Sequence, residues 1–427
     1  MERKQKKILD WYFNSNLLLR ILIGLVAGAI VGVIFGPKLS FLTPLGSILV
    51  NLLKMIVMPV ILSTLVVGAS SINPSALGRV GVKILAFYLF TSAFAVATGL
   101  LMGNIFKPGT GLDLSSTADA AGKVLTQPSL SDTFLSIIPK NPFGAISGGA
   151  VLPTIFFAIL LGIALSYLRR SKDKKIQQSG EIVFSFFNGL AEAMYLIVHG
   201  VLQYAPIGVF ALIAVVFGTH GANAFGPLGT VTGAAFLGYI LHVVVFYSVI
   251  LFAGGINPLT FLKGVRTPLL TAFVTRTSSG TLPVTMDAAE NNFGISRKVY
   301  SFTLPLGATV NMDGTAIYQG VCALFIGFAI GMPLTFTQQI TVILTAVLAS
   351  IGTAGVPGAG AIMLLMVLNS VGLPVEAGTP VAAAYAMIFG IDAILDMGRT
   401  AVNVTGDMAG TLLVAKSEKQ IDKERIR

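Results

Sequence analysis

Residues 275–283 of the chain read TRTSSGTLP and residues 349–360 read ASIGTAGVPGAG, and each stretch interrupts a hydrophobic segment with small polar residues, glycine and proline. The interrupted segments cover residues 268–292 and 338–371. Irregular backbone at membrane depth must be buried in protein or line a wet cavity, because lipid offers no partner to its N–H and C=O groups. Both segments are therefore predicted to be re-entrant helical hairpins that enter a bilayer from opposite faces. The alternative is that the glycines only allow close helix packing.

The remainder of the chain is unusually apolar. Of its 427 residues, 54% are hydrophobic and 11% are charged, whereas a soluble domain has about 25% charged residues. Apolar segments long enough to cross a bilayer lie at residues 17–36, 45–71, 80–106, 131–168, 182–217, 226–254, 298–331 and 379–415. The predicted fold is an all-α polytopic membrane protein with eight transmembrane helices and two re-entrant hairpins in an inverted-repeat arrangement.

The basic residues indicate how the chain is oriented. Lys and Arg outnumber Asp and Glu by 28 to 18, and they gather at the N-terminus, at residues 169–175 and in the tail. Such clusters are typical of cytoplasmic flanks rather than of a nucleic-acid-binding surface. Both termini are therefore expected in the cytoplasm, with the first hairpin starting and ending inside and the second outside. The first apolar segment is expected to be a span and not a cleaved signal peptide.

The last apolar segment carries its polar residues on one face. Asp392, Asp396, Arg399, Asn403 and Asp407 follow one another at intervals of 4, 3, 4 and 4 residues, which places them on one side of a helix. That side must avoid lipid. Because a guanidinium binds a carboxylate through two N–H groups, Arg399 is a candidate for a substrate carboxylate and Asp396 for an ammonium group. A buried ion-pair network without a substrate is the alternative.

A break is expected in the preceding span, where residues 304–315 read LPLGATVNMDGT. Proline and glycine weaken a helix, and an unwound turn frees carbonyl oxygens. Together with Asn311 and Asp313 these oxygens suit a hard cation such as sodium, and Asn403 with Asp407 offers a second set. The alternative for Asp313 is a hydrogen-bonded buried carboxylate without an ion.

Other reactive side chains give weaker signals. The hairpin tips offer backbone N–H groups that can hold a carboxylate, but they contain no histidine, lysine or cysteine to activate a nucleophile, so no enzyme is expected. His199, His220 and His242 are scattered without metal-ligand spacing and are interpreted as ordinary. Cys322 is interpreted as a residue of the packed apolar interior.

The stretches RTSSGT at 276–281 and NMDGT at 311–315, with the pattern from Asp392 to Asp407, resemble the excitatory amino acid transporter family, above all its archaeal sodium/aspartate members. The resemblance covers nearly the whole chain. It implies a homotrimer in the cell membrane, in which a scaffold of residues 1–79 and 131–222 holds a moving unit of residues 80–130 and 223–427. That unit would slide like an elevator, with the second hairpin as its outer gate.

The resemblance also implies roles for single residues. Arg399 and Thr315 would bind the side-chain carboxylate of the substrate, Asp396 its ammonium group, and Asn403 with Ser278 its α-carboxylate. The same site would include Arg276, Thr400, Val356 and Gly360. Three sodium ions and no organic cofactor are implied, one ion at Gly307, Asn311, Asn403 and Asp407, a second at Thr309, Met312, Ser350, Ile351 and Thr353, and a third at Asp313, Asn311, Tyr88, Thr91 and Ser92.

Departures from the family pattern refine the expected function. Gln319 stands where proton-coupled animal members have glutamate, so proton coupling and potassium counter-transport are not expected. Neutral amino acid members lack the arginine found at Arg399, and dicarboxylate members lack the aspartate found at Asp396. The expected function is sodium-driven uptake of an acidic amino acid, L-aspartate before L-glutamate. The alternative is a proton- or sodium-coupled C4-dicarboxylate carrier.

Two functions of other classes fit the residues less well. An intramembrane aspartyl protease could pair Asp313 with Asp392 or Asp396, but its two carboxylates must share a proton, and the nearby Arg399 would keep them ionised. A passive channel would line a continuous pore, whereas the polar residues here gather between two hairpin tips, as in an occluded site.

Overall fold

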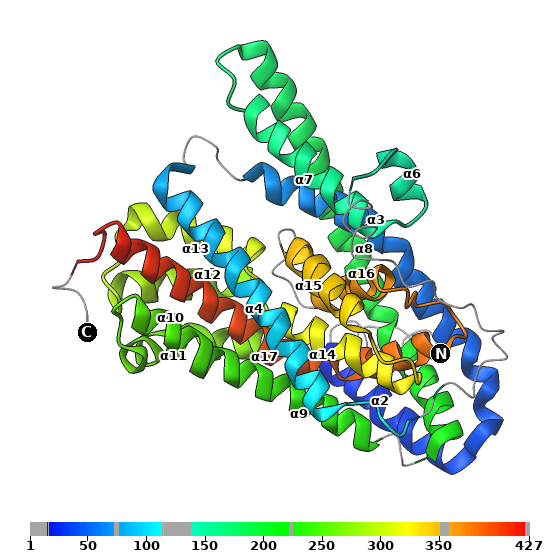
Figure 1. Cartoon of the computed structure of the whole chain (residues 1–427). Coiled ribbons are helices and arrows are strands. Elements are labelled where there is room, and N and C mark those ends of the chain that lie inside the picture. Colours follow the sequence, from blue (N-terminus) through cyan, green and yellow to red (C-terminus); the bar gives the residue numbers. More distant parts are fainter. Residues whose placement is uncertain are drawn as a thin grey trace, which may run out of the picture.

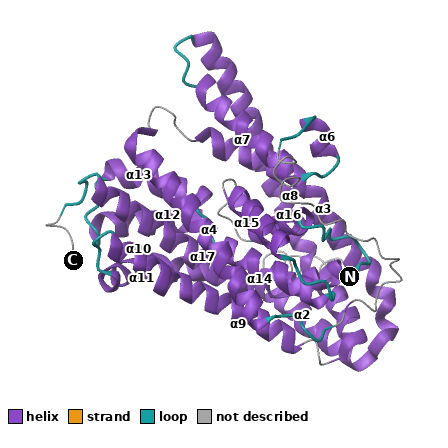
Figure 2. Cartoon of the chain, in the orientation of Figure 1, coloured by secondary structure: helices purple, strands orange, loops and turns teal. Residues whose placement is uncertain are grey.

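The computed structural model describes residues 15, 17–71, 77–112, 114, 138–221, 225–350 and 358–422. Within these residues the chain forms helices and no β-strand, as Figure 2 shows, which confirms the all-α prediction. One isolated β-bridge pairs Ile295 with Ile421.

The helices follow one another along the chain as α2 Leu17–Phe35, α3 Thr43–Ser71, α4 Val82–Phe106, α6 Pro142–Ser147, α7 Val151–Leu168, α8 Lys174–His220, α9 Phe225–Leu241, α10 Ser248–Ala253, α11 Pro258–Thr275, α12 Ser278–Asn291, α13 Arg297–Val310, α14 Asp313–Ala329, α15 Phe336–Ser350, α16 Ala359–Ser370 and α17 Pro380–Ser417. A 3-10 turn, η1, joins α2 to α3 over Gly36–Leu42. Two π-helical turns, η2 and η5, cover Leu77–Gly81 and His242–Tyr247.

Long apolar helices make this a multi-pass membrane protein. Six stretches in the described part of the chain are long and apolar enough to cross a bilayer, namely Leu19–Ser70, Arg79–Phe106, Lys174–Thr219, Phe225–Ala253, Arg297–Ala329 and Pro380–Ser417. The first of them, 52 residues long, contains both α2 and α3. Shorter apolar helices are formed by α7, α15 and α16. The count of eight crossings and the re-entry of the hairpins stay predictions.

Two element boundaries differ from the sequence-based expectation. The first hairpin begins at Pro258 and not at residue 268, because Asn257 accepts the N–H groups of Leu259 and Thr260 and caps α11. The segment predicted as one span over residues 131–168 contains two helices within its described part, α6 and α7. A glycine with positive φ, Gly149, separates them.

The helices pack in two groups. In the first group α8 lies along α2 and α3, and α7 lies on α3. Figure 1 shows α7 and the start of α8 projecting together from the rest of the molecule. In the second group α17 packs against α11, α13 and α14, and α14 packs against α4. The division into scaffold and moving unit stays a prediction.

Helix breaks lie where the sequence predicted irregular backbone. The helix over 297–329 is divided into α13 and α14, and Asn311 and Met312 between them are not helical. This confirms the unwound turn. The first interrupted segment forms two helices in contact, α11 and α12, and the second likewise forms α15 and α16. Of the helices beside these breaks, α11, α12, α13, α14 and α16 pack against α17.

Candidate functional site

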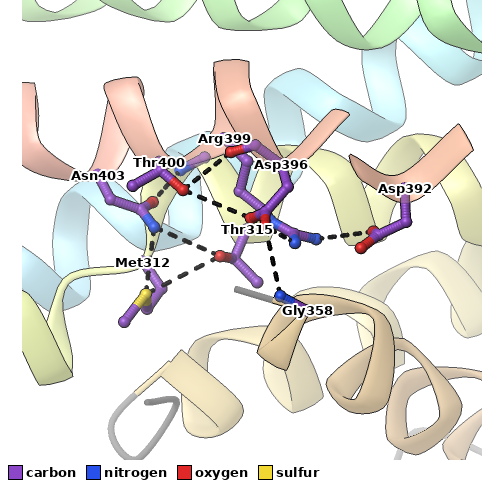
Figure 3. A network of polar contacts seen from close by, with 9 residues as sticks. Met312, Thr315, Gly358, Asp392, Asp396, Arg399, Thr400 and Asn403 are labelled. Carbon is purple, nitrogen blue, oxygen red and sulfur yellow. Dashed lines mark hydrogen bonds and ion pairs between the residues drawn. The ribbon is translucent and has the colours of Figure 1, made fainter. Parts of the chain in front are cut away.

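The polar face of α17 is buried. Exposed fractions are 6% for Asp392, 3% for Asp396, 2% for Arg399, 3% for Asn403 and 3% for Asp407. Because charged side chains are costly to bury alone, each must find polar partners inside the protein. The burial of this face agrees with the prediction that it turns away from lipid. The polar partners of its side chains define the candidate site (Figure 3).

Arg399 bonds to two carboxylates of its own helix. Its Nε and Nη2 donate to Asp396 Oδ1 at 3.0 and 2.6 Å, and its Nη1 donates to Asp392 Oδ1 at 3.2 Å. The ring of Tyr318 lies below the guanidinium, with 4.6 Å between Cζ and the ring centroid. Thr400 adds a bond from Oγ1 to Asp396 Oδ1 at 3.4 Å. The guanidinium is therefore neutralised within α17.

Asp392 is a site residue that no sequence pattern assigned to the substrate or to an ion. It lies seven residues before Arg399, so the helical spacing already placed it on the same face. Only the side-chain geometry shows that Asp392 takes part in the site, because the N–H groups of Arg399 are divided between Asp392 and Asp396.

The start of α16 touches this ion pair. Gly358, with φ +81°, directs its N–H to Asp396 Oδ2 at 3.3 Å. A Cβ at Gly360 would overlap with Arg399 Nη1. The start of α16 is therefore in direct contact with the pair, and a gating role of the second hairpin stays a prediction. The predicted site residues Val356, Ile351 and Thr353 lie outside the described residues.

Asn403 connects α17 to the broken turn, which is the unwound stretch of Asn311 and Met312 between α13 and α14. Its Oδ1 accepts the N–H of Gly314 at 2.8 Å, and its Nδ2 lies 3.2 Å from Met312 Sδ and 3.5 Å from Thr315 Oγ1. Asn403, Thr315 and Met312 are thus brought together beside Arg399, as Figure 3 shows. Their side chains offer amide, hydroxyl and thioether groups to a small ligand.

The tip of the first hairpin supplies the other predicted substrate residues. Arg276 ends α11 with φ +55°, a conformation that is uncommon for a residue with a side chain. Ser278 begins α12 and is 3% exposed. Among the described residues no hydrogen bond or ion pair joins either of them to α17, so their role in the site stays a prediction.

A first oxygen cluster surrounds Asn311. Its Nδ2 donates to Asp407 Oδ1 at 3.0 Å and to the carbonyl of Asn403 at 3.2 Å. Gly307 faces this cluster, because a Cβ there would lie 2.5 Å from Asp407 Oδ1 and 2.6 Å from Tyr88 Oη. Carboxylate, amide, carbonyl and phenol oxygens form a donor set that suits a hard cation.

A second oxygen cluster joins α4 to the broken turn. Ser92 Oγ donates to Asp313 Oδ1 at 2.8 Å, and Thr91 Oγ1 lies 3.5 Å from Asn311 Oδ1. Tyr88 Oη donates to the carbonyl of Thr303 at 3.0 Å. The side chains of Tyr88, Thr91 and Ser92 are buried. Of the five residues predicted for the third ion, Ser92 thus contacts Asp313 and Thr91 contacts Asn311, while the hydroxyl of Tyr88 bonds to Thr303.

The remaining predicted ion ligands are less closely connected. Thr309 Oγ1 donates to the carbonyl of Leu306 at 3.0 Å, and Ser350 Oγ donates to that of Val347 at 2.7 Å. Each bond stays within its own helix. Met312 belongs to the cluster around Asn403, and the place of a cation between Met312, Thr309 and Ser350 stays a prediction.

Two residues that no sequence pattern selects also lie close to Asp313. Tyr247 Oη donates to Asp313 Oδ2 at 2.7 Å, and His242 Nε2 lies 3.6 Å from the same oxygen. Both come from η5, the π-helical turn between α9 and α10. Only the packing of η5 against the broken turn identifies them.

The sequence is similar to that of known carriers over almost its full length. The profile of the sodium:dicarboxylate symporter family matches residues 17–417. The chain is 36% identical over 418 residues to the proton/sodium-glutamate symport protein of Geobacillus stearothermophilus, with 95% of each chain covered. It is 33% identical over 396 residues to the proton/glutamate-aspartate symporter of Escherichia coli, with 90% of this chain and 87% of that one covered. It is 32% identical over 421 residues to the C4-dicarboxylate transport protein of Rhodospirillum rubrum, with 97% and 91% covered.

Proposed function

The chain belongs to the sodium:dicarboxylate symporter family, and from that membership we propose that it takes up an acidic amino acid, L-aspartate before L-glutamate, driven by a sodium gradient. The family consists of transporters and not of enzymes. The proposal further places the protein in the plasma membrane as a homotrimer with both termini in the cytoplasm. Each protomer would use an elevator movement of residues 80–130 and 223–427 against the scaffold.

The observation that carries the substrate class is the buried pair of Arg399 and Asp396 beneath the second hairpin. An amino acid with an acidic side chain offers each member of this pair a new partner of opposite charge. Its side-chain carboxylate takes the fork of Arg399, and its ammonium group takes Asp396. Each member of the pair then meets an opposite charge on the substrate, so neither Arg399 nor Asp396 is left as an uncompensated buried charge.

The proposed ion sites are connected to the substrate site through Asn403. Asn311 belongs to both oxygen clusters and donates to the carbonyl of Asn403, while the side chain of Asn403 bonds to Gly314. A cation that binds between the oxygens of Asn311 and Asp407 therefore fixes the position of Asn403. Because Asn403 is the proposed partner of the α-carboxylate, ion binding and substrate binding favour each other.

Three sodium ions are proposed, at the sites that the family resemblance implies. Sodium supplies the positive charge that the two buried acids, Asp313 and Asp407, lack in these clusters. The residues of the chain bind and orient the ions, and the tip of the second hairpin closes over substrate and ions together. Movement of the unit then exchanges access between the two sides of the membrane.

A C4-dicarboxylate carrier is the second candidate, because one relative is the C4-dicarboxylate transport protein of Rhodospirillum rubrum. A dicarboxylate has no ammonium group. When Arg399 turns to such a substrate, Asp396 would be left buried without a cation beside it, which is unfavourable. The geometry therefore favours an amino acid.

Uptake of radiolabelled L-aspartate into proteoliposomes tests the proposal. An inward sodium gradient is expected to give accumulation, and a choline gradient or a proton gradient is not. Arg399→Ala is expected to abolish accumulation, whereas Arg266→Ala, on an exposed position of α11, is expected to leave it unchanged. Accumulation of succinate in place of L-aspartate, or uptake that follows the proton gradient, would overturn the proposal.

A further inference from the structure

The helix that leads from α9 to α10 contains a π-helical turn, η5, over His242–Tyr247. In an α-helix, residues five positions apart point about 140° away from each other. A π-helical turn is wider and brings such residues to one side, and π-turns are frequent at functional sites. Here the turn brings the rings of His242 and Tyr247 into edge contact, with 4.7 Å between their centroids.

Both of these side chains point to one oxygen of one carboxylate. Tyr247 Oη donates to Asp313 Oδ2 at 2.7 Å, and His242 Nε2 lies 3.6 Å from Oδ2. The other oxygen, Oδ1, accepts from Ser92 Oγ at 2.8 Å. The two oxygens of Asp313 therefore have different partners: Oδ2 accepts from Tyr247 of η5, and Oδ1 accepts from Ser92 of α4. The neighbour of Ser92, Thr91, has its Oγ1 3.5 Å from Asn311 Oδ1.

The surrounding packing leaves little room for another arrangement. A Cβ at Gly406 of α17 would overlap with Tyr247 Oη and lie 2.7 Å from Asn311 Nδ2. The ring of Phe246 stacks on that of His242, with centroids 4.5 Å apart and planes 25° apart. Glycine on one side and an aromatic ring on the other therefore fix where the two donors of η5 lie.

His242 has unused bonding capacity at this place. The side chain is fully buried, and neither ring nitrogen has a hydrogen-bond partner among the described residues. Buried polar atoms without a partner are rare in folded proteins and call for an explanation. A neutral imidazole with its proton on Nε2 can donate to Asp313 Oδ2 after a small movement of the carboxylate.

We propose that Tyr247 and His242 are positioning residues of the third cation site. They hold Asp313 Oδ2 so that Oδ1 faces a sodium ion together with the oxygens of Ser92, Thr91 and Asn311. The movement of the carboxylate on ion binding brings Oδ2 to His242. This inference rests on the proposed function, which places a sodium ion at Asp313, and it assigns the hydrogen bonds that set the affinity for that ion.

The matched pair of variants is Tyr247→Phe and Tyr239→Phe. Both remove one hydroxyl from a buried ring, but Tyr239 Oη has no hydrogen-bond partner among the described residues. A second pair is His242→Gln, which keeps an N–H donor of similar reach, and His242→Leu, which removes it. The full-length purified protein is used for all of them.

The first measurement is the thermal unfolding midpoint without substrate, as sodium replaces choline at constant ionic strength. The second is the rate of uptake as a function of the sodium and the L-aspartate concentration. Tyr247→Phe and His242→Leu are expected to raise the half-saturating sodium concentration by about 10-fold, as loss of an outer hydrogen bond does at other metal sites. Tyr239→Phe and His242→Gln are expected to stay near the wild type. The KM for L-aspartate at saturating sodium is expected to be unchanged in all four variants.

Two results would overturn the inference and can be told apart from failure of the proposed function. If the wild type responds to sodium and Tyr247→Phe responds at the same concentrations, the two residues do not position the ion. If Tyr247→Phe lowers the unfolding midpoint equally in choline and in sodium, their role is packing alone. If the wild type itself shows no sodium response in unfolding or uptake, the proposed function fails, and this inference fails with it.

Discussion

Arg399 bonds to Asp396, one turn before it on α17, through both Nε and Nη2, at 3.0 and 2.6 Å. The two groups proposed to bind the opposite charges of an amino acid therefore bind each other in the structure described here. A ligand that carries only one of these charges would have to separate the pair without replacing it. This relationship leads to the first two predictions.

Removal of the arginine is expected to reduce stability as well as transport. Arg399→Ala leaves Asp392 and Asp396 buried without their cation, which costs about 3–5 kcal/mol. The double variant Arg399→Ala with Asp392→Asn removes one of the stranded charges and should regain part of this loss. Unfolding midpoints in detergent measure both effects. A single variant as stable as the wild type would contradict the burial of this pair.

Asp392→Asn is expected to weaken substrate binding without removing it. Asp392 holds Nη1 of Arg399 at 3.2 Å, so its loss lets the guanidinium turn fully to Asp396, where it competes with the substrate ammonium group. Loss of one hydrogen bond to a charged group corresponds to an increase in the KM for L-aspartate of about 10-fold or more. Initial uptake rates at saturating sodium give this value. Asp287→Asn on the exposed side of α12 is the control.

The contact of the second hairpin with Arg399 requires glycine at position 360. In Gly360→Ala the new methyl group overlaps with Nη1 of Arg399, so the buried guanidinium or the start of α16 must shift. Transport is expected to fall by at least about 10-fold, because closure over the site is hindered. Gly233→Ala on α9 is the matched control, since its new methyl group meets nothing within 4 Å. Equal uptake rates in the two variants would argue against a gate at this position.

Asn311 is expected to couple both proposed ion sites to the substrate. Asn311→Ala removes the bonds to Asp407 and to the carbonyl of Asn403. Two lost hydrogen bonds correspond to a decrease of sodium affinity of about 10-fold or more. The Hill coefficient for sodium in uptake should fall as well. An unchanged Hill coefficient would show that the two oxygen clusters act independently.

An ion pair at one end of the molecule gives a pH dependence of stability. The hydrogen bond from Lys83, with the charges of Arg79 and Lys83, lowers the pKa of Glu418 below its ordinary value of 4.5. A lowered folded-state pKa means that the pair contributes above pH 4.5 and loses its contribution as the pH falls through the folded-state pKa. The unfolding midpoint of Glu418→Gln should therefore lie slightly below that of the wild type at pH 7 and should approach it at more acidic pH. If the difference between the two unfolding midpoints grew as the pH fell, the folded-state pKa of Glu418 would not be lowered.

Local sequence determined the helices and the polar face of α17. Five polar residues at helical spacing in an otherwise apolar segment can avoid lipid only by turning inward, and all five are buried. The broken turn was equally visible, because glycine, proline and asparagine weaken a helix wherever they occur. Its position between α13 and α14 agrees with that prediction. The first hairpin was the least accurate element, since Asn257 and Pro258 begin its helix ten residues earlier than the interrupted stretch indicated.

Tertiary structure alone decided which side chains meet around the broken turn. Ser92 and Asp313 lie 221 residues apart, and Tyr247 and Asp313 lie 66 residues apart. Patterns within one segment cannot report such contacts, because they depend on how helices pack and not on the periodicity of either helix. The residues of α4 were predicted only through resemblance to a family. His242 was interpreted as ordinary, and Tyr247 was not selected. Hydrophobicity and spacing therefore determined that this protein has a buried polar site between interrupted helices, while packing determined which oxygens line it.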